Sequence, residues 1–171
     1  ALLYGGFAGG VRRLSPDKTI KNFFDGLSIV KWSNVRTDGA AAHGDNFCDT
    51  DIPLFRLGEI YLTRAEALYR LGDKTGALRD IQKLQGRAHR KNLAQSLDLN
   101  YILDEWCREF YLEGRRRSDL VRFGLFTSSQ YLWSFKGGQE NGVGVDPHYN
   151  VYPIPANEIA GNANLHQNPD Y

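Results

Sequence analysis

The sequence predicts a mainly α-helical fold, in which helical hairpins carry long loops and a few short strands lie near the N-terminus. Two observations lead to this prediction. Between Pro53 and Gly137 the chain contains no proline, and apolar residues recur every three or four positions, as on the buried face of a helix. The 18 glycines exceed the roughly 12 that an average usage of about 7% would give, which indicates long, sharply turning connections.

The 171 residues are enough for one ordinary domain or for a piece of a larger one, and they fall into three stretches. Residues 1–53 hold paired glycines and short mixed runs, which predicts loops and one or two short strands. Residues 54–126 form the helical scaffold. In residues 127–171 the periodicity fades, so we expect an irregular C-terminal segment in which Pro155 opens one helical turn that reaches Ile159.

The first expected helix begins after Asp51, which serves as its N-cap, accepts Pro53 in its first turn and runs to Leu71. Its apolar side chains form one stripe: Leu57, Ile60, Tyr61, Ala65 and Leu68. A second helix runs from about Lys74 to Ala88. Its apolar side chains are Ala77, Leu78, Ile81, Leu84 and Ala88. The link between the two is short, which predicts an antiparallel hairpin.

The end of the first helix and the turn after it, residues 67–73, resemble half of a tetratricopeptide unit, in which small residues let two helices approach and glycine permits a tight turn. Such a hairpin could line a peptide-binding groove or serve as a packing scaffold. The scaffold is favoured, because a groove normally needs about three or more stacked repeats and the chain has one clear unit.

A third helix is expected from Leu99 to Glu113, ending at Gly114. One of its faces is apolar and comprises Leu99, Ile102, Leu103, Trp106 and Phe110. We place Trp106 in the core. A short fourth helix holds Leu120, Val121 and Leu125.

The charge balance excludes one large class of partner. The 21 Lys and Arg nearly cancel the 20 Asp and Glu, whereas a protein that binds nucleic acid usually carries a clear basic excess, so no nucleic-acid partner is expected. No run of about 18 apolar residues occurs, so no membrane-spanning helix is expected either. Cys48 and Cys107 are too few for a disulfide framework, and the sequence leaves their state open.

Charged residues gather on the third helix and at its exit, and three interpretations compete. Glu105 and Glu109 lie one helical turn apart, as a glycosidase pair could, but interleaved arginines would keep both carboxylates ionised, and a general acid needs a raised pKa. An arginine run at 115–117 could bind phosphate, but the balanced overall charge provides no excess of basic residues to support such a site. We favour a structural charge network that ties the hairpins together. Its predicted members are Arg56, Glu59, Glu66, Glu105, Glu109, Glu113, Arg115, Arg116 and Asp119.

Metal and catalytic motifs are missing from the sequence. His43, Asp45, Cys48, Asp49 and Asp51 lie within nine positions, but their spacing matches neither a zinc nor an EF-hand pattern, so a solvated loop is favoured over a metal site. Neither a Gly-x-Ser-x-Gly motif nor a phosphate-binding loop occurs. We therefore predict no catalytic residue, no metal and no cofactor, and interpret the protein as a non-enzyme.

The aromatic residues suggest a ligand instead. Three Trp, nine Tyr and nine Phe make up 12% of the chain, and Trp32, Trp133 and Tyr149 lie outside the helical stripes. An indole or phenol ring can stack on the apolar face of a sugar while neighbouring amide and charged groups bond its hydroxyls. These three residues are our candidate glycan contacts. The alternative is that they simply cover the hairpins.

Several motifs, taken in chain order, resemble those of the SusD/RagB family. Residues 53–67 (PLFRLGEIYLTRAEA) are similar to its R-x-x-E-x-x-L-x-x-A-E-A signature, and residues 109–122 (EFYLEGRRRSDLVR) to its E-L-x-x-E-G-x-R-x-x-D-L-x-R stretch. Pro153-Ile154-Pro155 and the closing QNPDY resemble the family's PIP and terminal QNPGY. The chain departs from the pattern at Trp106, where arginine is usual, and at Asp170, where glycine is common.

The resemblance implies the C-terminal part, residues 1–171, of a longer SusD-like protein. Such proteins are cell-surface lipoproteins of Bacteroidetes that lie at the outer membrane and are lipid-anchored through an N-terminal region, which we expect to be absent from this chain. They bind glycans without catalysis and pass them to a SusC-like TonB-dependent outer-membrane transporter. The alternative function is a helical-repeat protein-interaction scaffold without its own ligand site.

Overall fold

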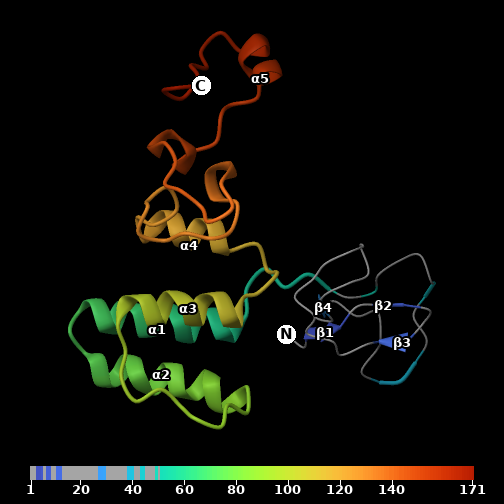
Figure 1. Cartoon of the computed structure of the whole chain (residues 1–171), viewed down its shortest axis with the longest axis vertical. Helices are drawn as coiled ribbons and strands as arrows, with labels where there is room; N and C mark the ends of the chain where they lie inside the picture. Colours follow the sequence, from blue (N-terminus) through green and yellow to red (C-terminus); the bar gives the residue numbers. More distant parts are fainter. Residues whose placement is uncertain are drawn as a thin grey trace. The chain divides into compact units, whose positions relative to one another are not determined.

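The computed structural model describes residues 51–171 in full, the short segments 38–40, 43–44 and 49, and the backbone of four short strands (Figure 1). The strands form two antiparallel pairs, β1 (Leu3–Gly5) with β4 (Leu27–Ile29) and β2 (Phe7–Ala8) with β3 (Val11–Arg12). The chain divides into two compact units, residues 1–97 and 98–171. The expected combination of helices, long loops and a few short strands is confirmed.

Helices α1 (Leu57–Arg70) and α2 (Lys74–Arg87) form the predicted hairpin of the first unit, side by side in Figure 1. Gly72 adopts a positive φ of +96° in the connecting turn, a conformation that glycine reaches without steric cost. Asp73 caps α2, since its carboxylate accepts a hydrogen bond of 2.8 Å from the backbone N–H of Gly76. These local signals end one helix and begin the next within three residues.

The core of this hairpin is built on large side chains that alternate with small ones. Leu62, Ala65, Ala77 and Ile81 are fully buried. Alanine at two of these positions lets the helices approach closely, because it adds little bulk between their backbones. The predicted apolar face of α2 is confirmed at Ala77, Ile81 and Leu84, whereas Ala88 lies beyond the helix and is exposed.

Two predictions about α1 are wrong. The helix begins at Leu57 rather than after Asp51, because Arg56 is extended and the first helical hydrogen bond joins the N–H of Glu59 to the Arg56 carbonyl. The predicted stripe is also displaced: Leu57 and Ile60 are 68% and 59% exposed, and the remaining predicted positions are half-buried (Tyr61, Leu68) or buried (Ala65). The buried face consists of Gly58, Leu62, Ala65 and Glu66. Both stripes have helical spacing, and packing selects the one with small residues.

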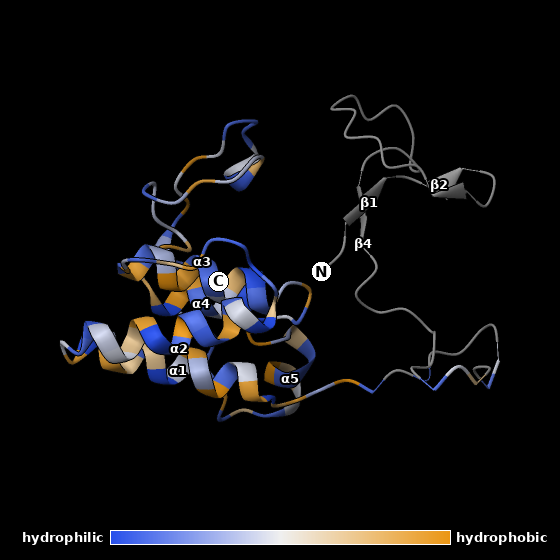
Figure 2. Cartoon of the chain, turned by 90° about the horizontal axis from the view of Figure 1, so that it is seen from below, coloured by the Kyte–Doolittle hydropathy of each residue, from blue (hydrophilic) through white to orange (hydrophobic). Residues whose placement is uncertain are grey.

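Helices α3 (Leu99–Glu109) and α4 (Arg116–Arg122) start the second unit. Asp98 caps α3 by accepting a hydrogen bond of 2.6 Å from the N–H of Tyr101. The helix ends four residues before the predicted Glu113, because Leu112 and Gly114 have positive φ angles of 60° and 74° that an α-helix cannot contain. Figure 2 shows hydrophobic and hydrophilic residues alternating around the helices. The core of this unit comprises Ile102, Leu103, Trp106, Phe110 and Leu120.

The C-terminal segment is irregular, as predicted, with two short 3₁₀-helices, η1 (Lys136–Gly138) and η2 (Pro147–Asn150). Pro155 precedes the short helix α5 (Ala156–Gly161), which confirms the expected turn. The side-chain amide of Gln167 bonds both backbone groups of Ile154, at 2.8 and 2.9 Å. The closing motif is thereby fixed to the Pro-Ile-Pro motif. In the described part of the chain, no helix is long and apolar enough to cross a membrane.

Candidate ligand-binding site

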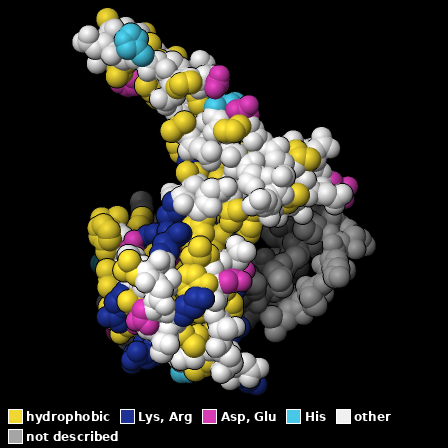
Figure 3. All heavy atoms as spheres, turned by 90° about the vertical axis from the view of Figure 1, so that its left-hand side faces the viewer, with side chains coloured by type: hydrophobic (Ala, Val, Ile, Leu, Met, Phe, Trp, Pro, Cys, Tyr) yellow, Lys and Arg dark blue, Asp and Glu magenta, His cyan; other side chains and the backbone are white. Residues whose placement is uncertain are grey.

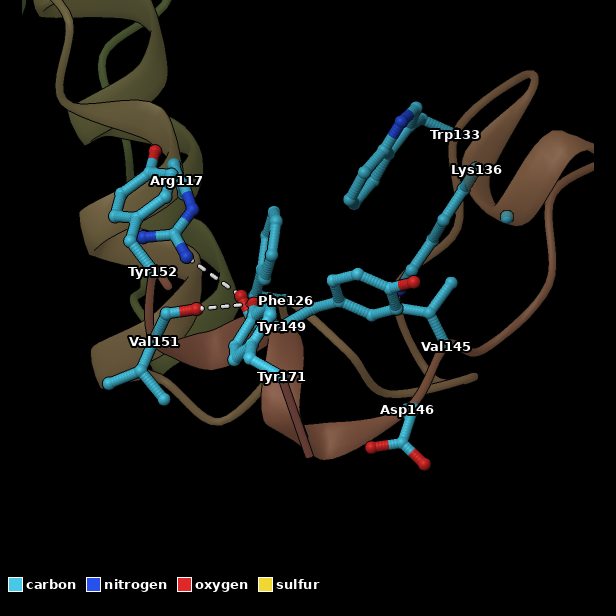
Figure 4. A pocket seen from close by; sticks show the side chains of 11 residues that line it. Arg117, Phe126, Trp133, Lys136, Val145, Asp146, Tyr149, Val151, Tyr152 and Tyr171 are labelled. Atoms are coloured by element: carbon cyan, nitrogen blue, oxygen red, sulfur yellow. Dashed lines mark hydrogen bonds between the residues drawn. The ribbon is translucent and has the colours of Figure 1, made fainter. Parts of the chain in front are cut away.

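A pocket of about 660 Å³ lies in the second unit, where loop 126–145, η2 and the C-terminus come together beside α4 (Figure 4). Five aromatic side chains line it: Phe126, Trp133, Tyr149, Tyr152 and Tyr171. Most of its walls are therefore apolar ring surface, with the charged residues Arg117, Lys136 and Asp146 at a few points. A concave, largely apolar space with a few polar groups is typical of a small-ligand site.

The rings hold one another in place. Trp133 stacks on Phe126 with the ring centroids 6.0 Å apart and the planes inclined by 30°. The ring centroids of Tyr149 and His148 lie 3.9 Å apart. The His148 ring is perpendicular to that of Tyr171, with the centroids 4.8 Å apart. Trp133 and Tyr149 nevertheless keep 39% and 49% of their surface exposed, so both rings offer free area to a ligand.

Arg117 ties three parts of the pocket together from helix α4. Its guanidinium lies 3.8 Å from the ring centroid of Tyr152 and 4.9 Å from that of Phe126. Its Nη2 also donates a hydrogen bond of 2.7 Å to the backbone carbonyl of Tyr149, drawn as a dashed line in Figure 4. The hydroxyl of Tyr171 donates to the carbonyl of Val151 at 2.8 Å. Segments distant in sequence are thus joined by a few directed contacts.

The two other charged groups have different surroundings. Asp146 accepts hydrogen bonds from the backbone N–H of His148 at 2.9 Å and from its ring at 2.8 Å, and these bonds lower the pKa of the Asp146 carboxyl. Lys136 is buried, and its ammonium donates to the carbonyls of Ser128 and Tyr131 at 2.5 and 2.7 Å. Burial lowers the pKa of Lys136, because the charged form loses solvation.

Loop 126–145 reaches this shape through backbone conformations that few residues adopt. Phe135, Gly137 and Gly138 have φ angles of +66°, +62° and +76° around η1. Gly142 also has a positive φ, and a Cβ at this position would collide with the backbone carbonyl of Trp133. Glycine is required here because the backbone approaches so closely. The loop closes where the N–H of Val145 donates to the carbonyl of Thr127 at 2.9 Å.

Two of the three predicted glycan contacts, Trp133 and Tyr149, meet in this pocket, although they lie 16 positions apart in the sequence. Trp32, the third, lies outside the described residues. The sequence analysis missed Phe126, Tyr152, Tyr171 and Arg117. Tyr152 and Tyr171 lie beside or within the Pro-Ile-Pro and terminal motifs, and Arg117 belongs to the arginine run at 115–117, but these signals do not show that the chain folds back on itself.

Some members of the predicted charge network pair with a residue of their own helix. Glu66 bonds Arg70 at 2.9 Å and Glu105 bonds Arg108 at 2.7 Å. Arg56, Glu59, Glu109 and Glu113 also have interaction partners. The joint contribution of the network to stability stays a prediction.

Around α4, Asp119 bonds Arg122 at 3.0 Å and lies 3.6 Å from Arg115. Arg116 reaches back to α3, where it donates to the carbonyl of Leu103 at 2.9 Å and lies 3.7 Å from Asp104. It also bonds the hydroxyl of Tyr131. These contacts join α3, α4 and the start of the pocket loop.

An ion pair that the sequence analysis did not single out links α1 to α2. Arg64 and Asp80 form two hydrogen bonds of 2.7 Å, and Asp80 is buried. This pairing raises the pKa of Arg64, first through the hydrogen bond to Asp80 and then through the charge of that carboxylate. A planar guanidinium fork matches a carboxylate in this way, so the pair also fixes the register of the hairpin.

The polar loop around residue 43 is described in part. The ring Nδ1 of His43 lies 3.1 Å from a carboxylate oxygen of Asp49, and His43 is exposed. Asp45 and Cys48 lie outside the described residues. No group of three or more His, Cys, Asp or Glu side chains comes together at metal-binding distance in the described part of the chain.

The fold and the pocket define a class: a helical scaffold that carries an aromatic pocket on irregular loops. Comparisons with known proteins identify the family. The model of the SusD family matches residues 14–171. The chain is 55% identical over 172 residues to the starch-binding protein SusD of Bacteroides thetaiotaomicron, a match that covers 100% of this chain and 30% of that protein. The chain belongs to the SusD family.

A solved structure agrees with this assignment. A SusD-like protein from Bacteroides fragilis superposes with a TM-score of 0.67 and 21% identity, covering 99% of this chain and 36% of that one. At this identity the likeness shows the fold. The predicted SusD/RagB resemblance and the partial SusD-like fold are both confirmed. The chain spans about a third of the length of the relatives that it matches.

Proposed function

We propose that the protein binds a glycan without transforming it, and that the aromatic pocket of the second unit contributes to this binding. The observation that carries the proposal is the joint placement of Trp133 and Tyr149, both partly exposed, on the wall of one pocket. Aromatic faces pack against the C–H groups of a pyranose ring, while Asp146 and backbone groups are available to its hydroxyls. The 55% identity to a starch-binding protein makes an α-glucan the first ligand to test.

The carboxylates support binding rather than hydrolysis. A glycosidase needs one carboxylic acid with a raised pKa beside a second carboxylate. Asp146, which lines the pocket, has a lowered pKa, so it is ionised near neutral pH. Glu105 accepts two hydrogen bonds from Arg108, at 2.7 and 3.0 Å, on helix α3. Neither group has the surroundings of a general acid.

Isothermal titration calorimetry of the protein with maltoheptaose tests the proposal. Trp133→Ala and Tyr149→Ala should each weaken binding about tenfold, which corresponds to about 1.4 kcal/mol. Phe55→Ala is the matched control, because Phe55 is a highly exposed aromatic residue outside the pocket, and its removal should leave the affinity unchanged. Trp32→Ala tests the third predicted contact in the same series.

Two results would contradict the proposal. Unchanged affinity in both Trp133→Ala and Tyr149→Ala would show that the glycan does not use this pocket. Release of shorter oligosaccharides from maltoheptaose, abolished by Glu105→Gln, would show catalysis. Titration with a second glycan series, such as β-linked glucans, decides whether the linkage matters.

We further propose that the protein acts at the outer membrane of the cell surface, lipid-anchored, and delivers its glycan to a SusC-like TonB-dependent transporter. Membership of the SusD family supports this role. Co-expression with a SusC-like transporter, followed by purification through a tag on either partner, should recover both in equal amounts. Recovery of each protein alone from solubilised membranes would contradict the delivery role.

The second candidate function, an interaction scaffold, is favoured by one surface. Ile52, Leu54 and Phe55, which precede α1, are each more than 80% exposed, and Leu57 and Ile60 continue the apolar surface. On the face of the helices that Figure 3 presents, hydrophobic side chains likewise reach the surface among Lys and Arg side chains. Contiguous exposed apolar groups are typical of protein contacts. If Phe55→Ser abolishes co-purification with the transporter while maltoheptaose binding persists, this surface serves the partner and the pocket serves the glycan.

A further inference from the structure

We propose that Lys136 is a positioning residue that holds the indole of Trp133 at the wall of the pocket. Lys136 does not need to touch the ligand for this purpose. Its effect on glycan affinity rests on the proposed function, whereas its effect on the Trp133 ring does not.

The contacts of Lys136 explain how it could act in this way. The ammonium donates to the carbonyls of Ser128 and Tyr131 at 2.5 and 2.7 Å, so it joins two points of the chain just before Trp133. The same ammonium lies 4.7 Å from the centroid of the Trp133 ring, within the range of a cation–π interaction. One charged group thus fixes both the backbone that leads to Trp133 and the face of its ring (Figure 4).

The backbone of Lys136 contributes to the same arrangement. Its N–H donates to the carbonyl of Trp133 at 3.1 Å, and its carbonyl accepts from the N–H of Val143 at 3.1 Å. Gly142 packs against that Trp133 carbonyl so closely that no Cβ would fit. The ring of Trp133 therefore projects from a turn that closes around the lysine.

A lysine at a buried position needs a reason, because removing an ammonium from water is unfavourable unless it is hydrogen-bonded. Lys136 is 2% exposed, and the pKa of its ammonium is lowered by burial. Two carbonyl oxygens and an aromatic face offset this cost, since both present partial negative charge to the ammonium. An apolar side chain of similar length could fill the space, but it would leave both carbonyls without this donor.

The test uses the protein labelled with 5-fluorotryptophan, with the ¹⁹F resonances of Trp133 and Trp106 assigned by single Trp→Phe substitutions. Lys136→Met should shift or broaden the Trp133 resonance and leave the Trp106 resonance in place. Lys136→Gln, which keeps a donor but not the charge, should give a smaller change. Lys83→Met is the matched control, because Lys83 is exposed on α2; it should move neither resonance.

A double-mutant cycle on maltoheptaose affinity provides the second measurement. Lys136→Met should weaken binding about tenfold, as Trp133→Ala does, and the double variant should lose no more than Trp133→Ala alone, because the lysine acts through the indole. Additive losses would overturn the proposal, as would an unmoved Trp133 resonance or a Trp106 resonance that moves with it. If Lys136→Met does not fold, Lys136→Gln carries the test. If the unmodified protein binds no glycan, the proposed function fails and the resonances alone decide the role of Lys136.

Discussion

Trp106 is the largest buried side chain in the described part of the chain, and its removal gives the sharpest stability prediction. The residue is 2% exposed, its ring lies 5.4 Å from that of Phe110, and the guanidinium of Arg115 lies 4.3 Å from its centroid. Burying about 150–250 Å² of aromatic surface at about 25 cal/mol per Å² corresponds to roughly 4–6 kcal/mol. This is an upper bound, because the unfolded chain already hides part of that surface.

We therefore expect Trp106→Ala to lower the free energy of unfolding by about 3–5 kcal/mol, as is usual when a large buried aromatic side chain is removed. Trp106→Phe keeps an aromatic ring for Phe110 and Arg115, and it should cost less than half as much. Urea unfolding followed by far-ultraviolet circular dichroism measures both values. The m-value should stay constant, which shows that the variants change the native state rather than the unfolded chain.

A matched control separates burial from the loss of an aromatic residue as such. Tyr111→Ala removes a ring that is 40% exposed from the turn that follows α3, and it should cost much less than Trp106→Ala, about 1 kcal/mol. If Trp106→Ala cost no more than Tyr111→Ala, the core would not depend on the indole and the packing argument would be refuted.

Two further predictions concern charged groups. Asp80→Asn should lower the melting temperature more than Asp104→Asn, measured by differential scanning calorimetry, because the buried Asp80 carboxylate accepts two hydrogen bonds from Arg64 whereas Asp104 is exposed; equal losses would contradict the role of this pair. Asp146 has a pKa below its ordinary 3.8, so its contribution to stability is present above that pH and disappears as the pH falls through the lowered pKa. Asp146→Asn should therefore lower the free energy of unfolding at neutral pH, and its curve should approach that of the unsubstituted protein as the pH falls below 3.8; a difference that stays the same at every pH would contradict the stabilising bonds from His148.

The elements that sequence predicts well are those built from local interactions. The periodicity of residues 54–126, the Gly72 turn and the turn after Pro155 all appear in the structure, because each depends on neighbours a few positions away. The sequence predicts the end of α3 four residues too late, because a positive φ at Leu112 is unfavourable for a leucine and no local signal indicates it.

Sequence by itself therefore determined the class of fold, the hairpin, the aromatic character of the candidate site and the likeness to the SusD family. Tertiary structure alone decided which stripe of α1 is buried, because two stripes have helical spacing and only packing against α2 distinguishes them. It also decided that Trp133 and Tyr149 share a pocket and that Lys136 is buried beneath one of them. These facts depend on contacts between residues far apart in the chain, and neither the spacing nor the composition of a sequence encodes which distant segments meet.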